Sequence, residues 1–226
     1  TSYSKVLEFS STASGKDVLG LEMDGYSILR KGRVQMLADY QIADQVRMFH
    51  MIDPFVDRES SNGRVSYGLT SAGYDARLGK SFYIATDEKN MTAVSPLTPG
   101  GKFPGIEYER KVVKLPGHTM ALAHTQEFFK IPPNICATIV GKSTWARLGL
   151  NVFCTPLEPG WEGQVTLELF NLGFAPIELR EGDGICQVQF HEISKPRQTY
   201  DQKHGKYQGQ LGITFAIKSK EMEDDR

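Results

Sequence analysis

From residue 66 onward, hydrophobic and polar residues alternate in short runs that Gly, Pro and Asn residues separate. The runs are SYGLTS (66–71), SFYIAT (81–86), VVKLPGHTMALAHTQEFF (112–129), ICATIVG (135–141), QVTLELFNL (164–172) and APIELREGDGICQVQFHEI (175–193). Alternation with a period of two is typical of half-buried β-strands, and many short runs indicate a sandwich or a barrel. The pattern therefore predicts a mainly β protein.

A helical pattern precedes these strands. Residues 34–51 place apolar side chains at helical spacings, so they predict one amphipathic helix, which IDPF at 52–55 ends because the residue before a proline avoids the helical conformation. Those apolar residues are Leu37, Ile42, Val46 and Phe49. The segment STWARLGL at 143–150 predicts one or two further helical turns between strands.

The pattern also divides the chain. Residues 1–33 show little periodicity and are interpreted as an N-terminal extension, either an arm or an added edge element. Residues 34–217 are predicted to form one domain, in which TPGGKFPG at 98–105 is a long turn and an insertion. Residues 218–226 are an acidic C-terminal tail.

Composition narrows the class of protein. The chain carries 26 Lys and Arg against 27 Asp and Glu, and a net charge of −1 argues against a general nucleic-acid coat. No apolar run approaches the roughly 18 residues that span a bilayer, and the first residues lack a secretory pattern. Cys136, Cys154 and Cys186 are widely spaced and odd in number, which favours free thiols in a reducing cytoplasm. We expect a cytoplasmic protein that binds neither nucleic acid nor membrane.

Two features between residues 141 and 171 suggest a binding or catalytic site. The first is a polar turn in which Lys142 supplies a point charge, Ser143 and Thr144 supply hydroxyl groups, and Arg147 follows Ser143 by one helical turn. Such a turn can hold phosphate oxygens, although a capped surface turn with a solvated arginine is the alternative. The second is Glu168, which alternation places on the face of Thr166. A carboxylate that faces inward costs several kcal/mol unless it is paired or has a function.

Five motifs follow one another along the chain. They are AGYDARLG (72–79), GKSTWARLGL (141–150), PLEPGWEGQVTLELFN (156–171), GDGICQVQF (182–190) and GKYQGQLG (205–212). Over roughly residues 34–217 the chain resembles the dCTP deaminase branch of the dUTPase-like superfamily, and most closely its bacterial branch with GKST and PLEPxWEG. The resemblance implies a distorted β-barrel or jelly-roll subunit with one or two short helices. It also implies a homotrimer with active sites between subunits.

The resemblance implies hydrolytic deamination of dCTP to dUTP and ammonia, which feeds thymidylate synthesis. It further implies Mg²⁺ bound with the triphosphate, no zinc, and feedback inhibition by dTTP. By position, Glu168 matches the catalytic glutamate, and Ser143 and Arg147 match residues that orient the water and the acid. The positions that match nucleotide contacts are Lys142, Ser143, Thr144, Arg147, Thr166, Leu167, Glu168, Gln187, Tyr200, Lys206 and Gln210. The contacts of Thr166 and Leu167 are made by the backbone in the family.

Hydrolysis is the main alternative to deamination. Asp75 in AGYD also resembles the first dUTPase motif, where an aspartate helps to hold Mg²⁺ through water, and pairing with Arg77 is the other interpretation of Asp75. Glu158 falls where hydrolases carry an acid that activates water, although a solvated loop acid is favoured here. The open alternatives are a bifunctional enzyme that takes dCTP to dUMP and pyrophosphate, a dUTPase, and a nucleotide-binding regulator without catalysis.

The neighbouring aromatic residues have structural interpretations. Trp145 and Trp161 can stack on a base, but such residues more often pack in a core or between subunits, so neither is assigned to the site. Phe153 and Cys154 stand where relatives often carry polar or β-branched residues, which leaves open whether modified cytosines are accepted.

Overall fold

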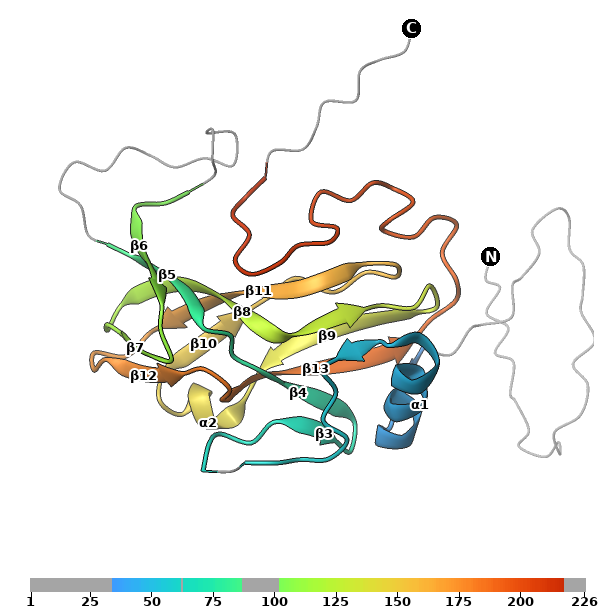
Figure 1. The fold of residues 1–226 in the computed structure, drawn as a ribbon, viewed down its shortest axis with the longest axis horizontal. Coiled ribbons are helices and arrows are strands. Elements are labelled where there is room, and N and C mark those ends of the chain that lie inside the picture. The colour runs from blue at the N-terminus through green and yellow to red at the C-terminus, as the bar shows by residue number, and fades with distance from the viewer. Residues whose placement is uncertain (1–33, 62, 87–101, 218–226) are drawn as a thin grey trace, which may run out of the picture. The chain divides into compact units, whose positions relative to one another are not determined.

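The computed structural model describes residues 34–61, 63–86 and 102–217, which form antiparallel β-sheets and two short helices (Figure 1). This confirms the prediction of a mainly β fold with one or two short helices. The predicted arm (1–33), the acidic tail (218–226) and residues 98–101 of the predicted insertion lie outside the described residues.

The first sheet is built around β13 (Gly184–Glu192). One edge of β13 pairs with β9 (Ile135–Gly141), and the other edge pairs with β4 (Gly73–Arg77) and then with β1 (Gln35–Met36). β3 (Gly68–Thr70) adds to the free side of β4. The sheet therefore brings the ends of β4, β13 and β9 next to one another.

The second sheet is built around the long strand β8 (Thr119–Lys130). Its partners are β11 (Glu162–Asn171), β5 (Ser81–Ala85) and the two-residue β2 (Ile52–Asp53). β10 (Leu150–Phe153) extends the sheet beyond β11, and β6 (Gly105–Glu109) extends it beyond β5. A separate ribbon consists of β7 (Val112–Leu115) and β12 (Ile177–Arg180).

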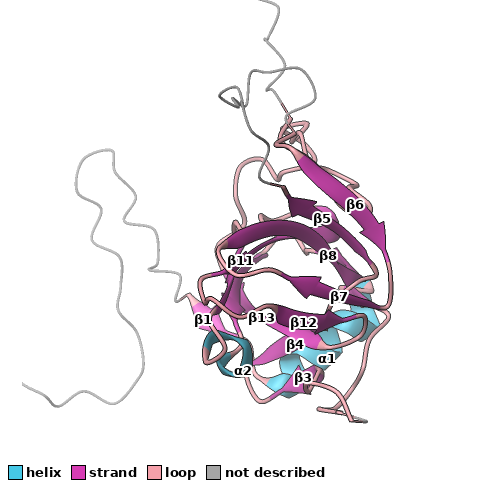
Figure 2. Ribbon diagram, turned by 90° about the vertical axis from the view of Figure 1, so that its left-hand side faces the viewer, coloured by secondary structure: helices cyan, strands magenta, loops and turns pink. Residues whose placement is uncertain are grey.

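One hydrophobic core joins the two sheets. Figure 2 shows the strands of both sheets from the side. The first sheet contributes buried residues such as Tyr74 and Phe190, and the second contributes Phe82, Phe129 and Leu167. Each large apolar side chain buried in this way stabilises the fold by roughly 1.5–3 kcal/mol. Burial alternates residue by residue along β11, as the sequence pattern predicts for a strand with one face in the core.

The first helix is shorter than its pattern suggests. α1 spans Asp39–Phe49, whereas the prediction was 34–51, because residues 35–36 pair with β13 as a strand. Leu37 is buried but precedes the helix. The helix ends at His50, which has a φ of 52°, so a left-handed cap ends it before Pro54 is reached. The second helix, α2 (Ser143–Ala146), confirms the predicted turn within 143–150.

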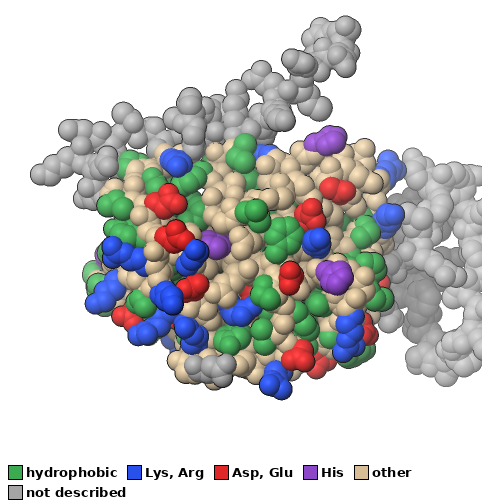
Figure 3. Space-filling model, viewed as in Figure 1, with side chains coloured by type: hydrophobic (Ala, Val, Ile, Leu, Met, Phe, Trp, Pro, Cys, Tyr) green, Lys and Arg blue, Asp and Glu red, His purple; other side chains and the backbone are tan. Residues whose placement is uncertain are grey.

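The surface agrees with the balanced composition. On the face drawn in Figure 3, Lys and Arg side chains are interspersed with Asp and Glu. Among the described residues, no helix has both the length and the apolar character that a membrane-spanning helix requires.

Candidate active site

A cavity of about 680 Å³ lies between β11, β8, the loop at 154–158 and the segment 200–216. Its walls are largely apolar and aromatic. The lining includes Phe103, Met120, Leu122, Cys154, Glu158, Trp161, Thr166, Glu168, Tyr200, Lys206, Tyr207, Gln210, Thr214 and Phe215. A concave, mostly apolar site with a few polar groups is the arrangement that small ligands commonly occupy.

Glu168 lies in the wall of this cavity. On β11 its Cα is paired with Leu122 of β8 and with Phe153 of β10, so apolar side chains surround the carboxylate. The residue is half-buried, and this burial raises the pKa of the Glu168 carboxyl above its usual value. The predicted orientation is confirmed, because Thr166 shares the cavity with Glu168 while Leu167 is buried on the opposite face. Only the backbone of Leu167 is therefore oriented for contact with a ligand.

The C-terminal segment is docked along β11. The Gly209 amide donates to the Glu162 carbonyl (2.8 Å), and the Gln164 amide donates to the Gln210 carbonyl (2.9 Å). Further along, the Gly212 amide donates to Gln164 Oε1 (2.8 Å). Through these bonds, the irregular C-terminal segment lies along the edge of β11 and forms part of the cavity wall.

Three predicted site residues on this segment join Glu168. Tyr200 lines the cavity, and its hydroxyl oxygen accepts a hydrogen bond from the Tyr207 amide (3.0 Å). Lys206 is exposed, and its Nζ donates to the Ile217 carbonyl (3.0 Å). Gln210 donates from Nε2 to the Gln164 carbonyl (2.8 Å). The structure thus brings Thr166, Glu168, Tyr200, Lys206 and Gln210 to one cavity.

Other residues of this cavity were not assigned to the site from the sequence. Trp161 is buried in its wall, and its Nε1 donates to the Tyr207 carbonyl (3.0 Å), which ties the C-terminal segment to the second sheet. Glu158 is exposed, as a loop acid is expected to be, yet it lines the same cavity. Cys154 also lines it and donates from Sγ to the Thr166 carbonyl (3.3 Å). Tertiary packing brings these residues to the cavity wall, so no local pattern in the sequence marks them.

The turn at 142–147 does not line this cavity. Ser143, Thr144 and Arg147 are exposed, and Arg147 Nη1 donates to the Ser143 carbonyl (3.0 Å), which confirms the predicted spacing of one helical turn. Figure 1 shows α2 at the lower side of the domain and the C-terminal segment at the upper side. On one chain, the predicted residues therefore form two separate groups.

Lys142 and Gln187 belong to a buried polar cluster around Asp75. Lys142 Nζ forms an ion pair with Asp75 Oδ2, and Gln187 Nε2 donates to Asp75 Oδ1 (3.2 Å). Lys142 is thus not the free point charge that the sequence suggested. The alternative in which Asp75 pairs with Arg77 is wrong, because Arg77 pairs with Glu127.

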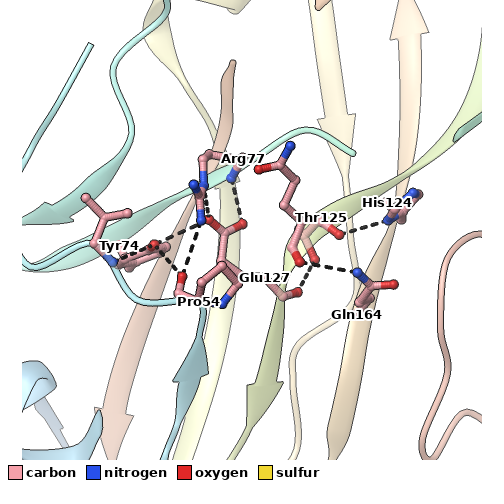
Figure 4. Close-up of polar contacts among 9 residues, drawn as sticks. Pro54, Tyr74, Arg77, His124, Thr125, Glu127 and Gln164 are labelled. Carbon is pink, nitrogen blue, oxygen red and sulfur yellow. Dashed lines mark hydrogen bonds and ion pairs between the residues drawn. The ribbon is translucent and has the colours of Figure 1, made fainter. Parts of the chain in front are cut away.

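The Arg77–Glu127 pair is a second polar cluster that the sequence did not reveal (Figure 4). Glu127 accepts hydrogen bonds from Arg77 Nε (2.7 Å), from the Arg77 amide (2.8 Å) and from the Tyr74 hydroxyl (3.3 Å). The Glu127 side chain has no exposed surface. Burial raises the pKa of the Glu127 carboxyl, while the charge of Arg77 acts in the opposite direction. The pair joins β4 of one sheet to β8 of the other.

The part of the chain that the structure describes contains no cluster of side chains suited to bind a metal ion. Within residues 34–61, 63–86 and 102–217, no three His, Cys, Asp or Glu side chains lie close enough together to hold a metal ion. Cys136, Cys154 and Cys186 are free thiols. His124 is buried with Nδ1 2.8 Å from the Thr125 carbonyl, and burial lowers the pKa of this imidazole.

Comparison with known proteins agrees with the mainly β fold. The 2′-deoxycytidine 5′-triphosphate deaminase of Agrobacterium tumefaciens shares the fold, with a TM-score of 0.52 and 18% identity over 70% of this chain and 48% of that chain. Among curated relatives, the dCTP deaminase of Ehrlichia canis is 42% identical over 185 residues, 81% of this chain and 98% of the relative. That of Wolbachia sp. subsp. Brugia malayi is 43% identical over 183 residues, 80% of this chain and 98% of the relative.

The fold is therefore mainly β and is shared with the deaminase of Agrobacterium tumefaciens. Within this class, the model of the dCTP deaminase-like family matches residues 36–193. The chain belongs to the dCTP deaminase-like family.

Proposed function

We propose that the protein catalyses the hydrolytic deamination of dCTP to dUTP and ammonia, in the cytoplasm and without zinc, and so supplies dUTP for thymidylate synthesis. The observation that carries this proposal is the half-buried Glu168 in the wall of a cavity, on a chain of the dCTP deaminase-like family. The names of the relatives support the choice of substrate.

The reaction needs one group that moves protons. Water attacks C4 of the cytosine ring, N3 takes a proton, and the C4 amine leaves as ammonia, so an oxygen replaces a nitrogen. Glu168 takes one proton from the attacking water and gives it to N3, then takes the second proton from the new C4 hydroxyl group and gives it to the leaving amine. Its raised pKa suits both steps, because burial makes the carboxylate a stronger base than an ordinary glutamate while the acid form still returns the proton.

The remaining predicted residues bind the nucleotide in this proposal. Thr166, Leu167, Tyr200, Lys206 and Gln210 contact base, sugar and phosphates from the cavity side. The triphosphate carries its own Mg²⁺, and dTTP binds the same site as a feedback inhibitor. Asp75 does not fit a metal role here, because Lys142 and Gln187 already engage its two carboxylate oxygens.

The site is completed by a second copy of the chain in our proposal. Ser143, Thr144 and Arg147 are exposed and do not line the cavity that holds Glu168. Symmetric assembly of identical subunits can bring two such groups together from neighbouring chains. We propose a homotrimer in which Ser143 and Arg147 of one subunit orient the water and Glu168 of the next.

A bifunctional enzyme is the second candidate function. Glu158 lines the same cavity as Glu168, so a second carboxylate is available at the site to activate water. In that case dCTP is converted to dUMP and pyrophosphate. A regulator without catalysis is less consistent with the chain, because Glu168, Ser143 and Arg147 are all retained.

Incubation with dCTP and Mg²⁺ separates these functions. Ammonia with dUTP identifies a deaminase, and ammonia with dUMP and pyrophosphate identifies the bifunctional enzyme. Pyrophosphate released only from added dUTP identifies a dUTPase, and nucleotide binding without turnover identifies a regulator.

Two matched variants assign the roles of the acids. Glu168→Gln should abolish ammonia release and keep nucleotide binding, and full turnover by this variant would exclude Glu168 as the proton carrier. Glu158→Gln should leave ammonia release intact, and it removes pyrophosphate release only if Glu158 activates water.

A further inference from the structure

Three neighbouring strands converge on Asp75. In the first sheet, Asp75 of β4 is paired with Gln187 of β13, and Gln187 is paired on its other side with Val140 of β9. β9 ends at Gly141, so Lys142 is the first residue beyond it. A carboxylate, an amide and an ammonium group from three strands therefore meet at one point.

The cluster around Asp75 is buried and well bonded. The Asp75 side chain is 5% exposed and that of Lys142 is 11% exposed. Lys142 Nζ contacts Asp75 Oδ2 and also donates to Ser66 Oγ (3.3 Å), while Gln187 Nε2 donates a hydrogen bond to Asp75 Oδ1. Since the removal of one partner from a buried ion pair leaves an uncompensated charge, Lys142 depends on the Asp75 carboxylate to keep this position.

The turn that follows Lys142 cannot hold its own conformation. α2 has only four residues, which is far below the length at which an isolated helix is stable, and no side chain caps its first turn. Two anchors tie it to the sheet. Lys142 is one, and buried Trp145, whose Nε1 donates to the Gly184 carbonyl (2.8 Å), is the other. Ser143 and Thr144 stand exposed between these anchors.

We propose that Asp75 is a positioning residue for the turn at 142–147. By holding Lys142, it sets the direction in which Ser143, Thr144 and Arg147 are presented to a nucleotide. Lys142 then contributes mainly by its ion pair with Asp75, which fixes the turn, and Asp75 has this role without contacting Mg²⁺. This inference rests on the proposed function, since it assumes that the turn binds dCTP.

The kinetic test uses Asp75→Asn, which keeps the shape and removes the charge. The KM for dCTP should rise at least about tenfold, as expected for the loss of a buried charge-assisted contact, while kcat stays within about threefold. The Mg²⁺ concentration for half-maximal rate should not change. A shifted Mg²⁺ requirement with a lower kcat would assign Asp75 to the metal instead, and an unchanged KM would refute a positioning role.

Hydrogen exchange tests the same inference without turnover. In Asp75→Asn the amides of residues 143–147 should exchange at least about tenfold faster, while those of β11 keep their parental rates. Equal acceleration in both regions would indicate general destabilisation and overturn the proposal. This result stands even if the parent protein does not deaminate dCTP, so the failure of the proposed function can be distinguished from the failure of this inference.

Two further variants complete the design. Asp75→Glu keeps the charge and supports folding if Asp75→Asn does not fold, and it should raise KM by a smaller factor than Asp75→Asn. Asp44→Asn removes an exposed aspartate that pairs with Arg47 on α1, so it should match the parent in KM and in exchange. Parental kinetics and exchange in Asp75→Glu together with an unfolded Asp75→Asn would contradict the proposal.

Discussion

The buried Arg77–Glu127 pair should be a main determinant of stability. The test is Glu127→Gln, which preserves the volume of the side chain and removes its charge. The amide nitrogen of Gln cannot accept a hydrogen bond, so at least one of the bonds from Arg77 Nε (2.7 Å) and the Arg77 amide (2.8 Å) is lost. The guanidinium of Arg77 also loses its counter-charge, and water cannot fully replace it because the Arg77 side chain is only 16% exposed.

The magnitude follows from this geometry. Removal of one partner from a buried ion pair costs about 3–5 kcal/mol. Arg77 Nη2 keeps a contact with the Pro54 carbonyl (3.3 Å) and some exposure, so the lower end, about 3 kcal/mol, is expected. For a chain of this size, that loss lowers the melting temperature by roughly 6–12 °C.

Urea unfolding at one fixed protein concentration measures the effect, because assembly makes stability depend on concentration. Glu178→Gln is the matched control, since the Glu178–Arg180 pair is 40% and 57% exposed and such pairs contribute about 0–1 kcal/mol. Replacement of both partners, Arg77→Met with Glu127→Leu, should recover part of the loss, because no buried charge is then uncompensated. A loss below about 1 kcal/mol in Glu127→Gln would refute the reasoning.

Three further outcomes are expected. Burial raises the pKa of Glu168 in the folded protein, so ionisation of this carboxyl destabilises the fold. The contribution of the protonated carboxyl to stability is fully present below the ordinary pKa of glutamate and is lost as the pH rises through the raised pKa. Glu168→Gln should therefore unfold at a higher urea concentration than the parent at pH 7, by a margin that shrinks toward pH 4; an equal margin at both would contradict this. Gly184→Ala should lower stability by at least about 2 kcal/mol, since its Cβ would overlap the backbone carbonyl of Ser66. Gly141→Ala meets open space and should cost much less in the same urea-unfolding assay. Gln164→Leu removes the acceptor of the Gly212 amide (2.8 Å), so hydrogen exchange around Gly212 should accelerate while that of β13 does not.

Much of the fold could be predicted because its signals are local. The alternation along β11 placed Thr166 and Glu168 on one face and Leu167 in the core, and the structure agrees. The start of α1 was less predictable. Leu37 fits the helical period, but residues 35–36 gain hydrogen bonds as a strand beside β13, a tertiary effect that outweighs local pattern.

The polar clusters could not be predicted because their partners are distant in sequence. Asp75 and Arg77 lie two apart on one strand, so mutual pairing was one of the two interpretations of Asp75, beside a metal role. In the structure each finds a partner on another strand, Lys142 for Asp75 and Glu127 for Arg77. No local periodicity carries information on such pairs. The same holds for Trp161, which reaches the cavity through the packing of the C-terminal segment.

The division of the candidate site into two groups leads to a test of assembly. If Glu168 of one subunit works with Arg147 of its neighbour, Glu168→Gln and Arg147→Ala chains should complement each other. In a cyclic trimer that contains both chains, one of the three sites has both residues intact, whichever chain is present twice. Mixed trimers, co-expressed with two affinity tags and purified on both, should therefore show about one third of the parental rate of ammonia release. Mixed trimers of two differently tagged Glu168→Gln chains provide the inactive control. If the mixed Glu168→Gln and Arg147→Ala trimers are equally inactive, the two residues act from the same chain, and the proposed site between subunits is wrong.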